Sequence, residues 1–203
     1  MRHILSVLAV GLLLIGCAPK SEPVHSADID TVIATRRSVR LFDATKTISR
    51  EEVQTLIATT QEAPTWANGQ PVRYHVAMSP EKADAVREVR GEWNKKNTEG
   101  AHFFIVSTYV KGLSGFFRGT PANEVGDGWG AYDNGLSDAY LILKARAMGF
   151  DTLIMGGRDA EAIRSILDIP QEEAVMSVIA LGYRSEDPER PKRKALEEIL
   201  KFY

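Results

Sequence analysis

Side chains that bind phosphate are concentrated near the start of this 203-residue sequence, in the run Arg36-Arg37-Ser38-Val39-Arg40. An arginine guanidinium binds phosphate oxygens through paired hydrogen bonds, and a serine hydroxyl can add a further short one. A second basic cluster lies near the other end of the chain, at Arg190, Lys192, Arg193 and Lys194. The two clusters predict an anion held between the first and last elements of one domain. The alternative is that both clusters are charged, solvated surface.

A proline-bounded turn carries one aromatic and two amide side chains, in the order Pro64-Thr65-Trp66-Ala67-Asn68-Gly69-Gln70-Pro71. An indole ring flanked by amides can face a planar heterocycle while the amides bind its polar edge. The alternative is an ordinary turn in which Asn68 hydrogen-bonds its own backbone. The spacing alone favours this alternative.

Paired glycines follow a predicted strand, in the run Ile154-Met155-Gly156-Gly157. Glycine has no Cβ, so the backbone N–H groups of such a pair can approach a ligand closely. A tight strand-to-helix turn explains the pair equally well.

Several kinds of chemistry are excluded by what the sequence lacks. The histidines beyond the leader, His25, His75 and His102, do not have metal-ligand spacing, so we expect no metal site. The absence of GxSxG, GxxxxGKS/T and strand-following GxGxxG motifs argues against a serine hydrolase, a P-loop enzyme and a Rossmann domain. The 25 basic and 27 acidic residues leave no overall basic field for nucleic acid. A single cysteine cannot form an intramolecular disulfide.

The first residues predict an export signal rather than part of the fold. Arg2 precedes an uncharged, mostly apolar run from Ile4 to Ile15, which is typical of a signal peptide and short for a membrane-spanning helix. The run ends in Leu14-Ile15-Gly16-Cys17, which resembles a bacterial lipobox, where the leader is cut before a cysteine that receives lipid chains. We therefore expect residues 1–16 to be a lipoprotein signal peptide and Cys17 to be lipidated. The alternative is a plain signal peptide with an incidental cysteine.

The predicted organisation is a lipidated tether followed by one domain. Residues 17–27 contain proline, serine and alanine without an apolar period, so we expect them to hold the domain off the membrane. Residues 28–203 then form the domain. Ala18 resembles the default signal for sorting to the outer membrane, so the expected location is the cell envelope, on the periplasmic side of that membrane.

Hydrophobic periodicity and capping residues predict helices and strands in mixed order. Helices are expected from Asp28 to the arginine cluster, at Ser49–Gln61, from Pro80 into the 90s, and at Asn134–Met148, Asp159–Leu167 and Leu196–Phe202. Strands are expected at Val72–Met78, His102–Val110, Thr152–Met155 and Ala174–Tyr183. The helix at 134–148 is apolar on most sides, which predicts that it is central and buried.

A long loop is expected between Lys111 and Gly130, where six of twenty residues are glycine. Loops of this length within a domain usually cover or border a functional site. Asp127, Asp133 and Asp138 around this loop could act as acids or bases, although solvation and helix capping are the simpler roles.

Four segments, in this order, resemble the nitroreductase family. The run at 36–42 looks like the family's opening motif, and 64–71 resembles its Pro-Ser-Ser-x-Asn-x-Gln-Pro turn. Residues 133–157, with Met-Gly-Phe and Gly-Gly, are similar to its central helix and following strand. Residues 179–196 resemble its Leu-Gly-Tyr strand and basic tail, so the resemblance covers about residues 29–200.

The resemblance implies an α+β fold with a mixed, mainly antiparallel sheet flanked by helices. It also implies a homodimer with the active site in the interface and one tightly bound flavin mononucleotide (FMN) in each subunit. By position, the phosphate and ribityl end of FMN would be held by Arg36, Arg37, Ser38, Arg40, Lys192 and Arg193. The flavin ring would be contacted from the partner subunit by Pro64, Thr65 and Trp66, with Asn68 and Gln70 as the amides of the same turn.

The remaining positions would lie at the polar edge of the flavin. Asn94 falls, on a loose alignment, where the family places an amide near the pyrimidine edge. Gly156 and Gly157 would present a backbone N–H to flavin N5, the atom that exchanges hydride, so Gly157 is the predicted catalytic position.

The implied function is that of an FMN-dependent oxidoreductase. It would pass electrons from a reduced donor, NAD(P)H in most of the family, to a nitroaromatic, quinone or similar small acceptor. The sequence departs from the family at Trp66, where a small serine is usual, and at Gly156, which replaces a residue that is often polar or acidic. The export signal would also separate the protein from NAD(P)H. The alternatives are therefore a flavin-binding electron-relay lipoprotein without NAD(P)H oxidase activity and a structural lipoprotein without cofactor.

Overall fold

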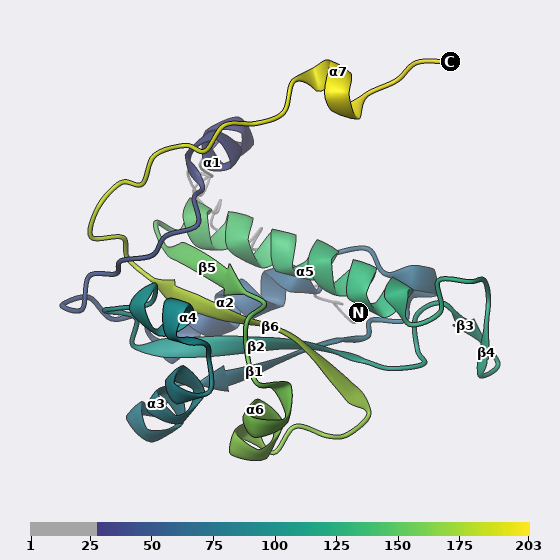
Figure 1. The fold of residues 1–203 in the computed structure, drawn as a ribbon, viewed down its shortest axis with the longest axis horizontal. Coiled ribbons are helices and arrows are strands. Elements are labelled where there is room, and N and C mark those ends of the chain that lie inside the picture. The colour runs from purple at the N-terminus through teal and green to yellow at the C-terminus, as the bar shows by residue number, and fades with distance from the viewer. Residues whose placement is uncertain (1–27) are drawn as a thin grey trace, which may run out of the picture.

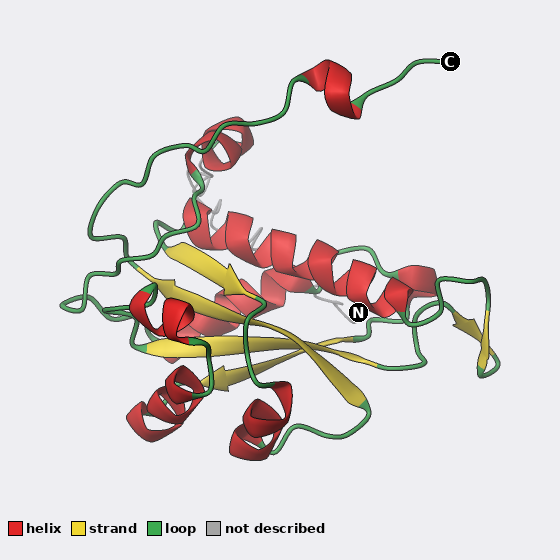
Figure 2. Cartoon of the chain, in the orientation of Figure 1, coloured by secondary structure: helices red, strands yellow, loops and turns green. Residues whose placement is uncertain are grey.

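The structure is a computed structural model that describes residues 28–203. The predicted signal peptide, Cys17, the tether and His25 lie outside these residues and stay predictions. The described residues form one four-stranded sheet with helices on both faces, and a short hairpin at one end (Figure 1, Figure 2). The helices are α1 (Ile29–Thr35), α2 (Arg50–Thr60), α3 (Pro80–Glu88), α4 (Glu92–Lys96), α5 (Gly128–Ala147), α6 (Ala160–Leu167) and α7 (Leu196–Ile199).

The sheet has the strand order β1-β2-β6-β5, and every neighbouring pair in it is antiparallel. Its strands are β1 (Val72–Ala77), β2 (Phe103–Val110), β5 (Asp151–Met155) and β6 (Glu173–Gly182). The two central strands are rich in β-branched and aromatic residues, which suit a pleated surface that is covered on both sides. All four strands end within one residue of their predicted bounds.

Alternating side chains of the central strands point into two separate cores. On one face, Ile105 of β2 and Ile179 of β6 pack with residues of α2 and α5. On the other face, Phe104 and Val178 pack with residues of α3 and α6. Burying a side chain of this size contributes about 1.5–3 kcal/mol. The sheet is therefore held between two helix layers, and its strand ends are fixed in space.

Two helices begin at the capping residues that the sequence predicts. The Ser49 hydroxyl accepts a hydrogen bond from Glu52 N (3.2 Å), and the Glu52 carboxylate accepts one from Ser49 N (2.7 Å), which completes a capping box at α2. Asp159 caps α6 by accepting a hydrogen bond from Ala162 N at 3.0 Å. Both capping predictions are confirmed. A cap depends only on residues that are close in the sequence, so the sequence alone can predict it.

Three predicted helix ends are wrong. The helix from Pro80 stops at Glu88, because Gly91 interrupts it before the chain turns again as α4. The last helix ends at Ile199 rather than Phe202. The central helix α5 begins at Gly128, six residues before its predicted start, so the expected loop is shorter than predicted.

The early start of α5 has a packing reason. A Cβ at Gly130 would lie 2.4 Å from the ring of Tyr109 on β2, so only glycine lets this end of the helix approach the sheet. The glycines that suggested a loop are thus partly helix residues selected by close contact. The rest of the loop contains a hairpin of β3 (Phe116–Phe117) and β4 (Thr120–Pro121).

The buried face of α5 differs from the apolar one that was predicted. The buried side chains of its first eleven residues are polar: Asp133, Asn134, Ser137 and Asp138. Tyr132 and Tyr140 are instead 59% and 38% exposed. Counting apolar residues around the helix could not show which side meets the sheet, because Ser107 and Ser177 of the sheet make a polar surface beneath it.

The C-terminal segment leaves the sheet after β6, runs past α1 and carries α7 away from the domain (Figure 1). Its apolar side chains are uncovered, and Ile199 and Phe202 are 70% and 89% exposed. Among residues 28–203, no helix has the length and apolar character needed to cross a bilayer.

Candidate functional site

The two basic clusters meet in the folded chain. Arg36, Arg37, Ser38 and Arg40 line a pocket of about 210 Å³ together with Pro188, Glu189, Pro191 and Arg193 from the C-terminal segment. Lys192 is exposed and is not one of the lining residues. The Nε of Arg37 is buried and has no hydrogen-bond partner in the described part of the chain. A pocket with four cationic side chains and an unsatisfied N–H is suited to a phosphate group.

The arginine run is held in place by the residue between its charges. Val39 is buried, and its N–H donates to Thr152 O of β5 at 3.0 Å, while Ser38 forms a parallel bridge with Thr152. The extended backbone there turns neighbouring side chains to opposite sides, so Val39 points into the core while Ser38 and Arg40 point away from it. The Arg37 guanidinium also donates to Ala34 O (2.7 Å), which fixes its direction at the end of α1.

A buried ion pair brings the C-terminal segment back to this place. Arg184, just after β6, donates to the two carboxylate oxygens of Asp151 at 2.8 and 2.6 Å and to Thr35 O at 3.3 Å. The hydrogen bonds that Arg184 donates to Asp151 raise the pKa of Arg184. Arg146 of α5 lies 3.6 Å from the same carboxylate. The start of the tail is thereby tied to β5 and to the end of α1.

The predicted glycine pair lies at the opposite end of β5 from this bridge. Gly156 and Gly157 directly follow the last residue of the strand, and the side-chain amide of Asn94 donates to Gly157 O at 2.6 Å. From Thr152 to Gly157 the strand advances by roughly 17 Å. A Cβ at Gly156 would meet open space, whereas one at Gly157 would lie 3.0 Å from the Asn94 amide. The edge of β5 therefore joins the arginine pocket to the glycine pair.

The turn at 64–71 lies elsewhere in the chain. Trp66 N donates to the Asp133 carboxylate of α5 at 3.0 Å, and Gln70 N donates to the Thr65 hydroxyl at 3.0 Å. Ala67, Asn68 and Gln70 have φ values of 47°, 55° and 47°, so the turn contains three residues in the left-handed region. The side chain that bonds the turn's own backbone belongs to Thr65, not to Asn68 as the simpler alternative expected.

The turn and the arginine pocket are at opposite ends of α5. Asp133, near the start of the helix, holds the turn, whereas Arg146, near its end, donates to the Thr35 hydroxyl beside the arginine run. The thirteen residue steps from Asp133 to Arg146 span about 20 Å along the helix. One copy of the chain does not bring these two groups of predicted site residues together.

Aromatic side chains that the sequence did not single out as a group gather at the turn. The rings of Trp66 and Trp129 are 4.7 Å apart, and those of Trp129 and Tyr132 are 5.6 Å apart. The Asp133 carboxylate also accepts from the Ser114 hydroxyl at 2.6 Å, so it joins the turn to the loop before α5. Asp133 is therefore a structural anchor rather than an acid or base.

The other two aspartates also bind parts of the fold. Asp127 accepts a hydrogen bond from Gly112 N at 2.6 Å. Asp138 accepts from the hydroxyls of Tyr74 (3.1 Å) and Ser107 (2.7 Å) under α5, where burial raises the pKa of both Asp138 and Tyr74. A carboxyl held only by hydroxyl groups is a packing element of the helix–sheet contact.

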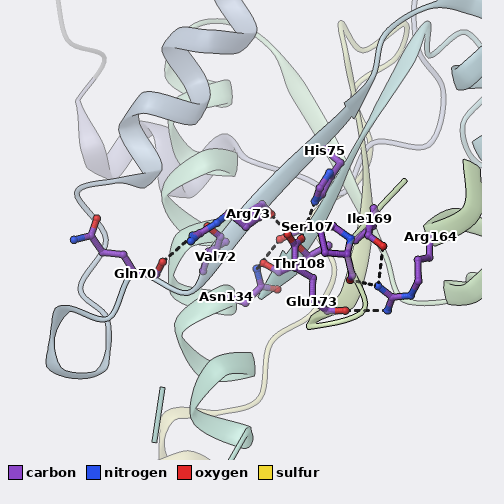
Figure 3. A network of polar contacts seen from close by, with 11 residues as sticks. Gln70, Val72, Arg73, His75, Ser107, Thr108, Asn134, Arg164, Ile169 and Glu173 are labelled. Atoms are coloured by element: carbon purple, nitrogen blue, oxygen red, sulfur yellow. Dashed lines mark hydrogen bonds and ion pairs between the residues drawn. The ribbon is translucent and has the colours of Figure 1, made fainter. Parts of the chain in front are cut away.

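The histidines take part in separate contacts. His75 lies 2.7 Å from the Glu173 carboxylate, which also accepts from the Thr108 hydroxyl, and Figure 3 shows these side chains side by side across the sheet. His102 lies 2.9 Å from Ala44 O. Within residues 28–203, no three His, Cys, Asp or Glu side chains gather in a way that could hold a metal ion.

Comparison with known proteins identifies the family. The sequence profile described as "Nitroreductase family" matches residues 33–183. Protein DrgA of Synechocystis is 25% identical over 188 residues, which cover 82% of this chain and 89% of DrgA. YdgI of Bacillus subtilis, assigned as an NAD(P)H nitroreductase, is 25% identical over 208 residues, which cover 88% of this chain and 99% of YdgI.

Solved structures share the fold. A protein of Exiguobacterium sibiricum, assigned as a nitroreductase and solved in complex with FMN, matches with a TM-score of 0.78 at 21% identity, over 87% of this chain and 98% of that one. The NADPH:FMN oxidoreductase of Vibrio harveyi, solved with NAD⁺, matches with a TM-score of 0.72 at 23% identity, over 86% and 76%. The predicted α+β fold and class of enzyme are confirmed, and the chain belongs to the nitroreductase family of oxidoreductases.

Proposed function

We propose that the chain binds FMN along the outer edge of β5 and works as an FMN-dependent oxidoreductase. The observation that carries this proposal is the arginine pocket, in which Arg193 of the tail joins Arg36, Arg37 and Arg40, and the buried Arg37 N–H has no partner among residues 28–203. A phosphate would satisfy that N–H and neutralise the cluster. Buried donors without partners cost about 1–3 kcal/mol, so such a group favours a ligand that accepts from it.

The far end of β5 fits the polar edge of the flavin ring. Gly156 leaves open space beside the strand, and the contact between the Asn94 amide and Gly157 O fixes both groups at that edge. Backbone N–H groups at this glycine pair would be free to approach the ring closely. FMN held there by Asn94 and the glycine pair would supply hydride transfer between a reduced donor and a small acceptor. Ser38, bridged to β5, would add its hydroxyl at the phosphate end.

We also propose that the working form is a homodimer. Pro64, Thr65 and Trp66 lie at the opposite end of α5 from the arginine pocket, so in this scheme they reach the flavin of a second copy. The exposed tyrosines of α5 and the apolar residues of α7 offer surface for that contact. In the dimer Asn68 and Gln70 shape the turn, and Trp66 narrows the space over the ring.

The proposed donor is NAD(P)H, and the proposed acceptor is a nitroaromatic, quinone or similar small molecule. YdgI is named as an NAD(P)H nitroreductase, and the Vibrio harveyi protein is named as an NADPH:FMN oxidoreductase. The leader sequence favours a second candidate, an electron-relay lipoprotein that is reduced by another protein of the envelope. This candidate would bind FMN in the same way but would not oxidise NAD(P)H.

Absorption and reduction experiments test these proposals in order. The full-length protein, purified in mild detergent, is expected to show a flavin spectrum or to bind added FMN with a rise in melting temperature. If FMN neither copurifies nor binds, both candidates are wrong. Stopped-flow mixing with NADH and NADPH then separates them, since bleaching of the flavin absorbance supports the enzyme and lack of reaction supports the relay.

We propose that Cys17 carries the lipid that anchors the protein to the outer membrane, facing the periplasm. The support is the sequence alone, an apolar run that ends in Leu14-Ile15-Gly16-Cys17. Two or three acyl chains anchor firmly, because each buried CH₂ contributes about 0.8 kcal/mol. Replacement Cys17→Ser is expected to release the protein into the soluble fraction, with Ser21→Ala as the control. Retention of the Cys17→Ser protein in washed membranes would contradict the anchor.

A further inference from the structure

Arg90 is the most deeply buried basic residue in the described part of the chain, and no feature of the sequence marked it. It lies between α3 and α4 and is 2% exposed. Its guanidinium carbon is 4.1 Å from the centroid of the Phe104 ring, in the core under α3 and α6. Burial lowers its pKa to about 10, so the group remains charged at neutral pH.

This buried charge is not matched by a carboxylate. Among residues 28–203, no Asp or Glu oxygen lies within 4.0 Å of the Arg90 guanidinium, and the neighbouring Glu88 pairs instead with Lys95 at 2.8 Å. Nη2 of Arg90 is buried and has no hydrogen-bond partner among the described residues. A buried cation is costly unless something nearby compensates it, and here the negative charge that acts on Arg90 comes from Glu88, an exposed side chain that is ion-paired with Lys95.

The contacts that Arg90 does make lead to the polar edge of the proposed flavin site. Its Nη1 donates to Thr98 Oγ1 at 2.9 Å, to Met155 Sδ at 3.3 Å and to Asn94 O at 3.4 Å. Met155 is the last residue of β5, directly before the glycine pair. The Asn94 side chain in turn donates to Gly157 O at 2.6 Å. One guanidinium therefore joins α4 to the end of β5.

Arg90 and the glycine pair also border the same hollow. Arg90, Gly91, Gly157 and Arg158 line a wide, open surface hollow of about 840 Å³ at this edge, together with the acidic residues Glu88, Asp159 and Glu161. A charge in a poorly solvated place acts on a nearby ring more strongly than one in water. Charge near the polar edge of a flavin is a means by which a protein tunes the cofactor.

We propose that Arg90 is a positioning residue for the polar edge of FMN and supplies a buried positive charge that favours the reduced, more negative flavin. By bonding both Asn94 and Met155, Arg90 fixes their relative positions. The Asn94 amide and the glycine pair after Met155 can then contact the flavin ring at the same time. The proposal rests on the proposed function, because it requires FMN at the end of β5.

The midpoint potential of bound FMN tests the charge. In the full-length protein Arg90→Met removes the charge and keeps an apolar side chain of similar length. The matched control is Arg87→Met, because Arg87 lies over the same Phe104 ring at 5.3 Å but bonds Asp84 and Ala101 O instead. We expect Arg90→Met to lower the preference for reduced over oxidised FMN at least tenfold, a fall of about 30 mV for a two-electron couple. A potential equal to that of Arg87→Met would overturn the proposal.

The affinity for FMN tests the positioning role. Arg90→Lys keeps the charge but cannot reach Thr98, Met155 and Asn94 together, so we expect about tenfold weaker binding with an unchanged potential. If Arg90→Met does not fold, the FMN affinity of Arg90→Lys is compared with that of Arg87→Lys. Equal affinity of these two variants would overturn the proposal. Failure of the unaltered protein to bind FMN refutes the proposed function as a whole. Binding with no difference between the Arg90 and Arg87 variants refutes only the role of Arg90.

Discussion

At the scale of single residues, the candidate site depends on arginines whose contacts are unequal. Arg37 is fixed by backbone carbonyl groups at the end of α1, and its buried Nε–H has no partner in the part of the chain that the structure describes. Arg193 lines the same pocket from an exposed part of the tail. A ligand phosphate would complete the bonding of Arg37, so Arg37 should contribute more to binding than the exposed cations.

Replacing Arg37 by alanine should weaken FMN binding by about 10- to 100-fold, because a charged hydrogen bond contributes about 1.5–3 kcal/mol. Fluorescence titration of FMN measures the change. Arg50→Ala, which removes an exposed charge from α2, is the control and should bind as the unaltered protein does. An affinity that does not change in Arg37→Ala would place the phosphate elsewhere.

At the scale of elements, α5 connects the two halves of the proposed site. Its first half carries a polar buried face against the sheet, and its end contacts α1 through Arg146. Asp138 is the centre of the buried face and receives hydroxyl donors from β1 and β2. Burial raises the pKa of its carboxyl, so the folded chain holds this proton to a higher pH than the unfolded chain does.

This shift gives α5 a pH-dependent effect on stability. A carboxyl whose pKa is raised by folding loses stabilising free energy as the pH rises from about 4 through the raised pKa. Asp138→Asn removes that ionisation. As the pH rises from about 4 to about 7, the free energy of unfolding of the variant should therefore increase relative to that of the unaltered protein. Urea denaturation at several pH values measures it, with exposed Asp30→Asn as the control. Parallel profiles for Asp138→Asn and the unaltered protein would contradict this account.

At the scale of the whole molecule, one copy of the chain holds the residues of the proposed site in two separate groups. The arginine pocket and the glycine pair share β5, whereas the turn with Trp66 is anchored at the far end of α5. The C-terminal segment ends in apolar side chains that its own domain does not cover. Both features are explained if a second copy covers the tail and completes the site.

Removal of residues 195–203 should therefore weaken the dimer while leaving Arg193 in its pocket. Sedimentation or light scattering over a range of concentrations should show a lower mass for the shortened chain than for the intact one. The double variant Ile199→Ser, Phe202→Ser tests the apolar side chains without shortening the chain, and it should act in the same direction. A dimer of unchanged strength in both proteins would show that the tail does not join the copies.

The sequence was sufficient for features that depend on near neighbours. The capping box of Ser49 and Glu52 and the bounds of all four sheet strands are local, and they agree with the structure. The start of α5 does not depend on near neighbours alone, because the Tyr109 ring on β2 leaves room only for glycine at position 130. Arg90 could not be recognised either, since an arginine beside other charges gives no sign that it will be buried.

The sequence by itself determined the family, the fold class and the kinds of side chain available for a phosphate and a flavin ring. Only the tertiary structure decided which of them meet. Arg193 and Arg37 line the same pocket, and Lys192 does not. Asn94 donates a hydrogen bond to Gly157, and Trp66 donates one to Asp133. These pairs are far apart in the chain, so their contact depends on how the sheet and helices pack. Packing is decided by the whole domain at once, whereas motifs and caps are decided by a few consecutive residues.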